Sequence, residues 1–278
     1  VTHFYGPFEA LLKDYVVQPW PVDQNYNDEQ MRFGQVARLW DKIHPPGSAE
    51  WNEYLKAHLK LGTTFDPTMT AYAAGRDLMR MRNADWHDKY TLPSLMDFYV
   101  SSRSNHGSYF YYWTLWDEVA WRNFYQVWFR LLNDYKKMGG RVTASADAAF
   151  IYNTYGFGNI HEMELLQEAG FHPLEVIQAA TMNPAMTLSE PKGKPIEFGV
   201  VRPGLLADLR VAANASTLGG HTASGRQGAA VPGDGHTAGL SGVLFGPEVP
   251  MVSGLSQGCT PLGPPMQITQ ASRNVIVA

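Results

Sequence analysis

The sequence predicts an α/β fold in which short parallel strands alternate with longer helices. Three stretches favour strands, at residues 1–3, 61–65 and 141–147, and the segments between them carry helical signals. This alternation is what a parallel sheet with helical crossovers requires. The third stretch ends on a lone carboxylate, Asp147, and in a β/α barrel the carboxyl ends of the strands face the active site.

Two helices are expected between the first and second strands. Asn27 can cap a helix that runs to about residue 43, and a second helix from about residue 49 to 61 follows the Pro-Pro-Gly break at residues 45–47. Asp66 and Pro67 close the second strand. A long helical insertion at about residues 72–138 then leads to the third strand, and it is far longer than a minimal barrel unit needs.

A dense block of aromatic residues lies within this insertion. From Trp121 onward the spacing is helical, which favours a helix that packs a wide apolar face. Residues 109–113 lack a clean period and are the best candidates for an alternative, a lid or pocket wall for an apolar substrate. The block consists of Tyr109, Phe110, Tyr111, Tyr112, Trp113, Trp116, Trp121, Phe124, Tyr125, Trp128 and Phe129.

A helical pair is expected after Asp147. Asn159, with Glu162 three residues on, is typical of a capping box that opens a helix to residue 169. Gly170 is placed to close that helix as the C′ residue, and Pro173 to begin the next one, through about residue 181.

The sequence changes character after this pair. Residues 199–211, centred on Pro203 and Gly204, favour a β-hairpin. Residues 212–278 form a charge-poor tail rich in glycine and proline, because positions 211–278 hold 4 of the 48 charged residues but 12 of the 26 glycines. Such a composition predicts a poorly packed or disordered tail, and translation out of frame is the alternative explanation.

Composition narrows the class of protein. A chain of 278 residues with 45% apolar and 17% charged side chains fits one large domain or two modest ones. The net charge of −4 and pI of about 6.1 give no basic field for nucleic acid, and no apolar run could span a bilayer. A single cysteine, Cys259, excludes an internal disulfide and suits the cytoplasm or the periplasm. Because the stretch from Val1 shows no basic n-region and no apolar h-region, we expect no targeting segment in this sequence.

Two residues are the leading candidates for chemistry. Asp147 at a strand end can ligate a metal or act as a base, although a carboxylate there can equally cap a loop. His3 also follows a strand and can be a ligand or a structural histidine. The sequence has no HxH, HExxH or Cys/His cluster and no nucleotide-binding glycine motif, and His106 is a weaker loop candidate.

Three segments together resemble the metal-dependent amidohydrolase superfamily, in the branch of imidazolonepropionase-like and prolidase-like enzymes. Residues 145–148 read SADA and are similar to that family's GTDA or GSDA motif at the last barrel strand. Residues 164–181 resemble its ELELLxEAGxxPLEALRAAT helix pair. Residues 199–209 resemble the GxVxPGKLADL hairpin that leads into its small β-sandwich.

This resemblance implies the last three strands of a (β/α)8 barrel over residues 1–198, followed by the start of a β-sandwich. It implies a hydrolase acting on the carbon–nitrogen bond of an amide or cyclic amide, in which His3 and Asp147 bind a divalent metal, zinc by ligand preference, and Asp147 is the general base. The expected partner is a small-molecule or short peptide-like substrate. Tyr5, Tyr152 and Tyr155 lie near the predicted strand ends and are candidate substrate contacts.

The resemblance is incomplete, which leaves an alternative open. The family's HxH strand, its bridging lysine and a further histidine would all precede Val1. The alternative is therefore a catalytically incomplete fragment or a non-enzymatic binding protein, inactive as this chain alone.

Overall fold

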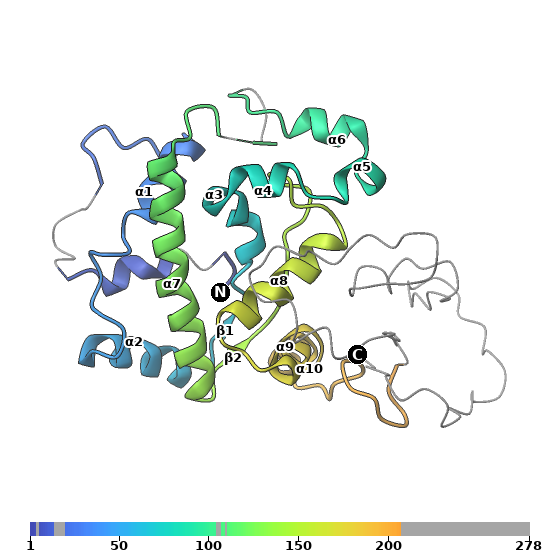
Figure 1. The fold of residues 1–278 in the computed structure, drawn as a ribbon. Coiled ribbons are helices and arrows are strands. Elements are labelled where there is room, and N and C mark those ends of the chain that lie inside the picture. The colour runs from blue at the N-terminus through green and yellow to red at the C-terminus, as the bar shows by residue number, and fades with distance from the viewer. Residues whose placement is uncertain (4–5, 14–19, 104–106, 109, 207–278) are drawn as a thin grey trace. The chain divides into compact units, whose positions relative to one another are not determined.

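Most of the residues in regular structure lie in helices (Figure 1). The computed structural model describes residues 1–3, 6–13, 20–103, 107–108 and 110–206. The chain divides into two compact units, residues 1–180 and 181–278. The first unit contains η1 (Gly6–Leu11), α1 (Glu29–Ala37), α2 (Ala49–Lys60), β1 (Thr64–Phe65), η2 (Met69–Tyr72), α3 (Ala73–Arg76), α4 (Leu78–Arg82), α5 (His87–Tyr90), α6 (Pro93–Phe98), α7 (Leu115–Lys137), β2 (Arg141–Val142), α8 (Phe157–Glu168) and α9 (Pro173–Ala180).

The three predicted strand segments do lie side by side and parallel, but each is very short. Thr64 pairs with Arg141 and Phe65 with Val142, and an isolated parallel bridge joins Thr2 to Asp66. The pairing stops because Pro67 has no N–H to donate, and because the N–H of Ala144 donates to a helix carbonyl, that of Ala179, at 3.0 Å.

The prediction of a partial (β/α)8 barrel that runs into a β-sandwich is therefore wrong for the residues that the structure describes. Their only sheet has two strands of two residues each. The sequence pattern located the strands but overstated their length. The β-branched residues that favour a strand occur whether or not hydrogen bonding to a neighbouring strand continues beyond two residues.

Helix α7 supplies the largest part of the core of the first unit. Its buried aromatic side chains recur at helical spacing and confirm the expected apolar face. At its start the Asp117 carboxylate accepts hydrogen bonds from the backbone N–H and the hydroxyl of Thr114, at 2.9 and 2.7 Å. The apolar face consists of Trp121, Phe124, Tyr125, Trp128, Phe129, Leu131, Leu132 and Tyr135.

The same helix fastens the segment that follows β1. The ring of Trp121 stacks on Tyr72, with centroids 5.5 Å apart and planes at 7°. The hydroxyl of Tyr125 donates to the carbonyl of Met69 at 2.5 Å, and that of Tyr135 donates to the carbonyl of Thr63 at 2.5 Å. Residues 63–72 are thus held along their whole length by one helix.

The start of α8 differs from the expected capping box. Gly156, at φ 80°, precedes the helix, and Asn159 lies inside it rather than at its cap. Glu162 points away from the helix start and binds η2 instead. The other end follows expectation, because Gly170 adopts φ 90° after α8 and Pro173 begins α9.

The described part of the second unit contains α10 (Met182–Ser189), η3 (Glu190–Lys192) and turns up to residue 206. Residues 199–206 contain no strand. The N–H of Leu206 donates to the carbonyl of Glu197 at 2.7 Å in place of a hairpin ladder. The rest of the expected hairpin and the tail at 212–278 lie outside the described residues, so the domain boundaries at 198 and 211 stay predictions.

The hydropathy of the helices shows whether any of them could cross a membrane. Among the described residues, no helix combines the length and the apolar character needed to cross a membrane.

We predict that Trp121→Ala destabilises the protein by about 3–5 kcal/mol, because it removes a fully buried ring and leaves a cavity. Trp116→Ala on the same helix is the matched control. Its side chain is 79% exposed, so the expected change stays within about 0.5 kcal/mol. Urea unfolding followed by circular dichroism measures both, and equal effects would show that the α7 face is not the core.

Candidate functional site

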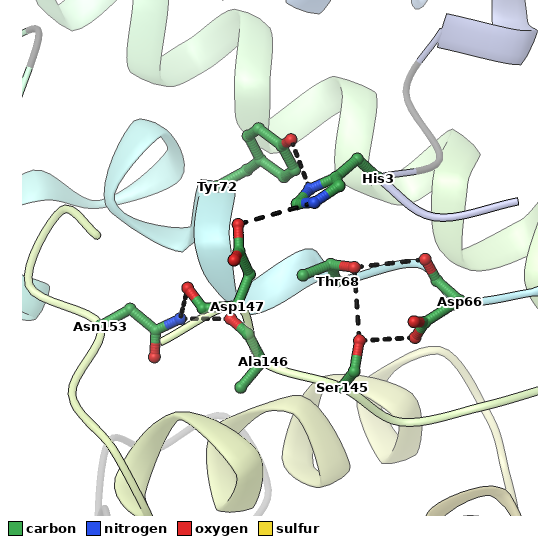
Figure 2. Close-up of polar contacts among 8 residues, drawn as sticks. All are labelled: His3, Asp66, Thr68, Tyr72, Ser145, Ala146, Asp147 and Asn153. Atoms are coloured by element: carbon green, nitrogen blue, oxygen red, sulfur yellow. Dashed lines mark hydrogen bonds and ion pairs between the residues drawn. The ribbon is translucent and has the colours of Figure 1, made fainter. Parts of the chain in front are cut away.

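Seven polar residues gather where the three parallel segments end (Figure 2). They come from three stretches of chain that the sheet pairing brings together. The set consists of His3 after the first segment, Asp66, Thr68 and Tyr72 after β1, and Ser145, Asp147 and Asn153 after β2.

His3 lies between a tyrosine and a carboxylate. Its Nδ1 is 3.1 Å from the hydroxyl of Tyr72, and its Nε2 is 3.6 Å from Oδ2 of Asp147. If the tyrosine hydroxyl donates, the imidazole proton sits on Nε2 and faces the carboxylate; this tautomer is assigned from the contacts. The distance of 3.6 Å between His3 Nε2 and Asp147 Oδ2 is longer than a hydrogen bond, so each of these two groups can still bind another partner.

The pair is also open to solvent. The side chains of His3 and Asp147 are 40% and 51% exposed, so a small molecule can reach both. The structure therefore brings together the two leading candidates of the sequence analysis, although it does not test the roles expected of them.

A second set of contacts fixes the loops beneath this pair. The hydroxyl of Ser145 donates to Oδ1 of Asp66 at 2.6 Å, and that of Thr68 donates to the Asp66 carbonyl at 3.2 Å. The side-chain amide of Asn153 donates to the carbonyl of Asp147 at 3.3 Å and to that of Ala146. The Ser145–Asp66 bond joins the loop after β1 to the loop after β2, and the other bonds lie within one loop each.

Left-handed backbone conformations concentrate in the same loops. Each costs a non-glycine residue about 1–3 kcal/mol and persists only where the surroundings enforce it. In the described part of the chain, the non-glycine residues at positive φ are His3 (51°), Thr68 (54°), Asp147 (46°), Ala149 (80°), Ile151 (44°) and Tyr152 (62°). Strain gathered at one place is typical of a functional site.

A buried carboxylate anchors one of these loops from below. Glu162 on α8 accepts hydrogen bonds from the Thr70 N–H and hydroxyl, both at 2.7 Å, and from the Met69 N–H at 3.1 Å. Burial raises the pKa of Glu162 to about 7, because desolvation outweighs these donors. Sequence reasoning missed this role, since the spacing from Asn159 explained Glu162 as part of a cap.

The neighbouring His161 is also buried. Burial lowers its pKa to about 3, and Arg76 and Arg80 lower it further, so the imidazole is neutral at physiological pH.

Two of the three tyrosines expected as substrate contacts are described by the structure, and they differ in exposure. Tyr152 is buried, with its ring 5.2 Å from that of Tyr99 and 6.2 Å from that of His87. Tyr155 is 72% exposed. Tyr5 and the loop histidine His106 lie outside the described residues, so all four roles stay predictions.

The described residues do not fit the expected metal site. They contain no group of three or more His, Cys, Asp or Glu side chains that could hold an ion. His3 and Asp147 supply two ligands, whereas a catalytic zinc takes three from the protein and a structural zinc four. The prediction of a zinc-binding centre is wrong for this part of the chain.

Comparison with known proteins gives one finding. A family model described as the FIST N domain matches residues 178–278. No curated protein and no solved structure gives a significant match to the chain. Residues 178–206 of the matched range are described by the structure.

This finding overturns the family resemblance. The matched range includes residues 199–209, which the resemblance assigned to an amidohydrolase hairpin, and the family that matches there is a different one. Membership of the amidohydrolase superfamily and hydrolysis of carbon–nitrogen bonds are therefore wrong for this chain. The error arose because short motifs at a strand end and a helix pair recur in unrelated folds.

We predict that Ala149→Gly stabilises the protein by about 1 kcal/mol, because glycine adopts a φ of 80° without steric cost. Ala148→Gly is the matched control, one residue away and not at positive φ, and it should destabilise by about 0.5–1 kcal/mol. Thermal unfolding of both variants measures these two changes in stability. The same sign for both would show that the loop backbone is not strained.

A divalent metal for the whole chain remains a proposal that metal analysis tests. With two ligands in the described part, we expect far less than one Zn²⁺ per chain after dialysis. One equivalent of Zn²⁺ that is lost on His3→Gln would instead establish the pair as a metal site.

Proposed function

We propose that this protein is a small-ligand-binding protein of the sensor type. The observation that carries the proposal is the match of residues 178–278 to the FIST N domain, since FIST domains are a family of signal-transduction sensor domains and small ligands are the partners suited to them. The expected small-molecule partner is compatible with this match.

The geometry of the first unit supports the proposal and offers a place for a ligand. His3 Nε2 and the Asp147 carboxylate lie 3.6 Å apart on part-exposed side chains, one as a donor and the other as an acceptor. A ligand that presents an acceptor and a donor side by side can satisfy both at once, and bonds to ionised groups are the stronger ones. Small-molecule sites commonly use a few polar groups placed in this way.

Rigid surroundings further support binding. The loops that carry Thr68 and Asp147 are tied to each other through Asp66 and Ser145. Groups fixed before binding lose less conformational entropy when a ligand arrives. In this proposal His3 and Asp147 contact the ligand directly, and the exposed Tyr155 is a further contact.

We expect a thermal-shift screen of the full chain against small polar metabolites, followed by calorimetry, to find a ligand that Asp147→Asn binds about 10- to 100-fold more weakly. The range reflects loss of a hydrogen bond to a charged group, worth about 1.5–3 kcal/mol. Asparagine tolerates the left-handed backbone, so the fold is expected to persist.

Asp97→Asn is the matched control, because it makes the same chemical change at an exposed aspartate on α6. A ligand bound equally by both variants would belong to another site, such as residues 178–278. Failure of every compound in the screen to bind would overturn the proposed function.

A further inference from the structure

Glu162 lies at the junction between α8 and the loop of the candidate site. Its side chain is fully buried, and its two carboxylate oxygens accept three hydrogen bonds from Met69 and Thr70. Both donor residues belong to η2, the element that follows β1.

The segment held in this way leads directly to the site. Thr68, in the left-handed region, immediately precedes the two donors, and its hydroxyl is 3.5 Å from that of Ser145. Tyr72 ends η2 and contacts His3. The position of the Tyr72 hydroxyl, and with it the tautomer of His3, therefore depends on how firmly η2 is held.

The contacts fit the ionised form of the carboxyl group. All three neighbours donate, and an ionised carboxylate accepts from each of them. When a proton from solvent binds, the O–H that forms faces one of these donors, so at least one of the three contacts is lost or reversed. The Thr70 hydroxyl has the Gly158 carbonyl, 3.3 Å away, as its other acceptor.

The environment of Glu162 shifts its ionisation toward neutral pH. Burial and, to a smaller extent, the Asp66 carboxylate raise the pKa of Glu162 to about 7. Tyr125 of α7 has a pKa well above its ordinary value because of burial, and it donates to the Met69 carbonyl. The other charged or titratable groups nearby are His161, which stays neutral, Arg76, which pairs with Glu168, and Arg80.

We propose that Glu162 is a positioning residue of the His3–Asp147 site, and that a proton bound there loosens η2 and alters the Tyr72–His3 contact. This regulation rests on the proposed function. It makes ligand binding at His3 and Asp147 depend on Glu162, a residue that does not touch the ligand. Its test needs no ligand, so the two proposals can fail separately.

The test is a pH titration of the full chain by NMR, with backbone amides labelled and assigned. The amides of Thr68 and Tyr72, at the two ends of the segment that Glu162 holds, should each report a transition near pH 7 that is absent in Glu162→Gln. Loss of that transition from both signals is the expected result. Glu53→Gln makes the same chemical change at an exposed glutamate of α2 and should leave the transition unchanged.

A second variant keeps the proposal testable if Glu162→Gln does not fold. Thr70→Val removes one donor to the carboxylate, so the same transition should move to higher pH. If the transition is missing from the wild type, persists in Glu162→Gln or stays in place in Thr70→Val, then Glu162 does not position the site.

Discussion

The contact between α7 and residues 63–72 is the interaction on which the first unit depends. Tyr135 binds the start of this segment, Tyr125 its middle and Trp121 its end. A sheet of two-residue strands contributes few hydrogen bonds, and a ladder so short is not stable alone. The aromatic face of α7 therefore performs the task that longer strands perform in ordinary parallel sheets, and it fixes where the candidate site lies.

Hydrogen bonds from buried and half-buried polar groups hold η2 and the two site loops in addition to the apolar packing. The Glu162 carboxylate satisfies the first donors of η2 from below, while Ser145 and Asp66 join the two site loops. Because these groups are buried or half-buried, each bond left unmade would cost about 1–3 kcal/mol. The loops are thus held tightly enough to keep several non-glycine residues at positive φ, and His3 and Asp147 remain the open, unsaturated pair of the arrangement.

The helix ends show how far local signals can be trusted. Gly170 and Pro173 delimit their helices as expected, because the conformations they require are properties of single residues. The capping box predicted for Asn159 and Glu162 does not form. The same two residue types can make other contacts, and here Glu162 accepts hydrogen bonds from η2. The family resemblance failed for a similar reason: three short motifs were each plausible, but the barrel that would unite them is absent from the described residues.

The sequence by itself determined the helical face of α7, the ends of the α8–α9 pair and the three segments whose carboxyl ends meet. It also indicated His3 and Asp147 as candidates, since both follow strand-forming residues, and their functional roles stay predictions. Only the tertiary structure decided that the strands stop after two residues and that Glu162 holds η2. Strand length and the partner of a buried charge depend on residues far away in the chain, 92 positions apart for Glu162 and Thr70, and local propensity carries no information about them.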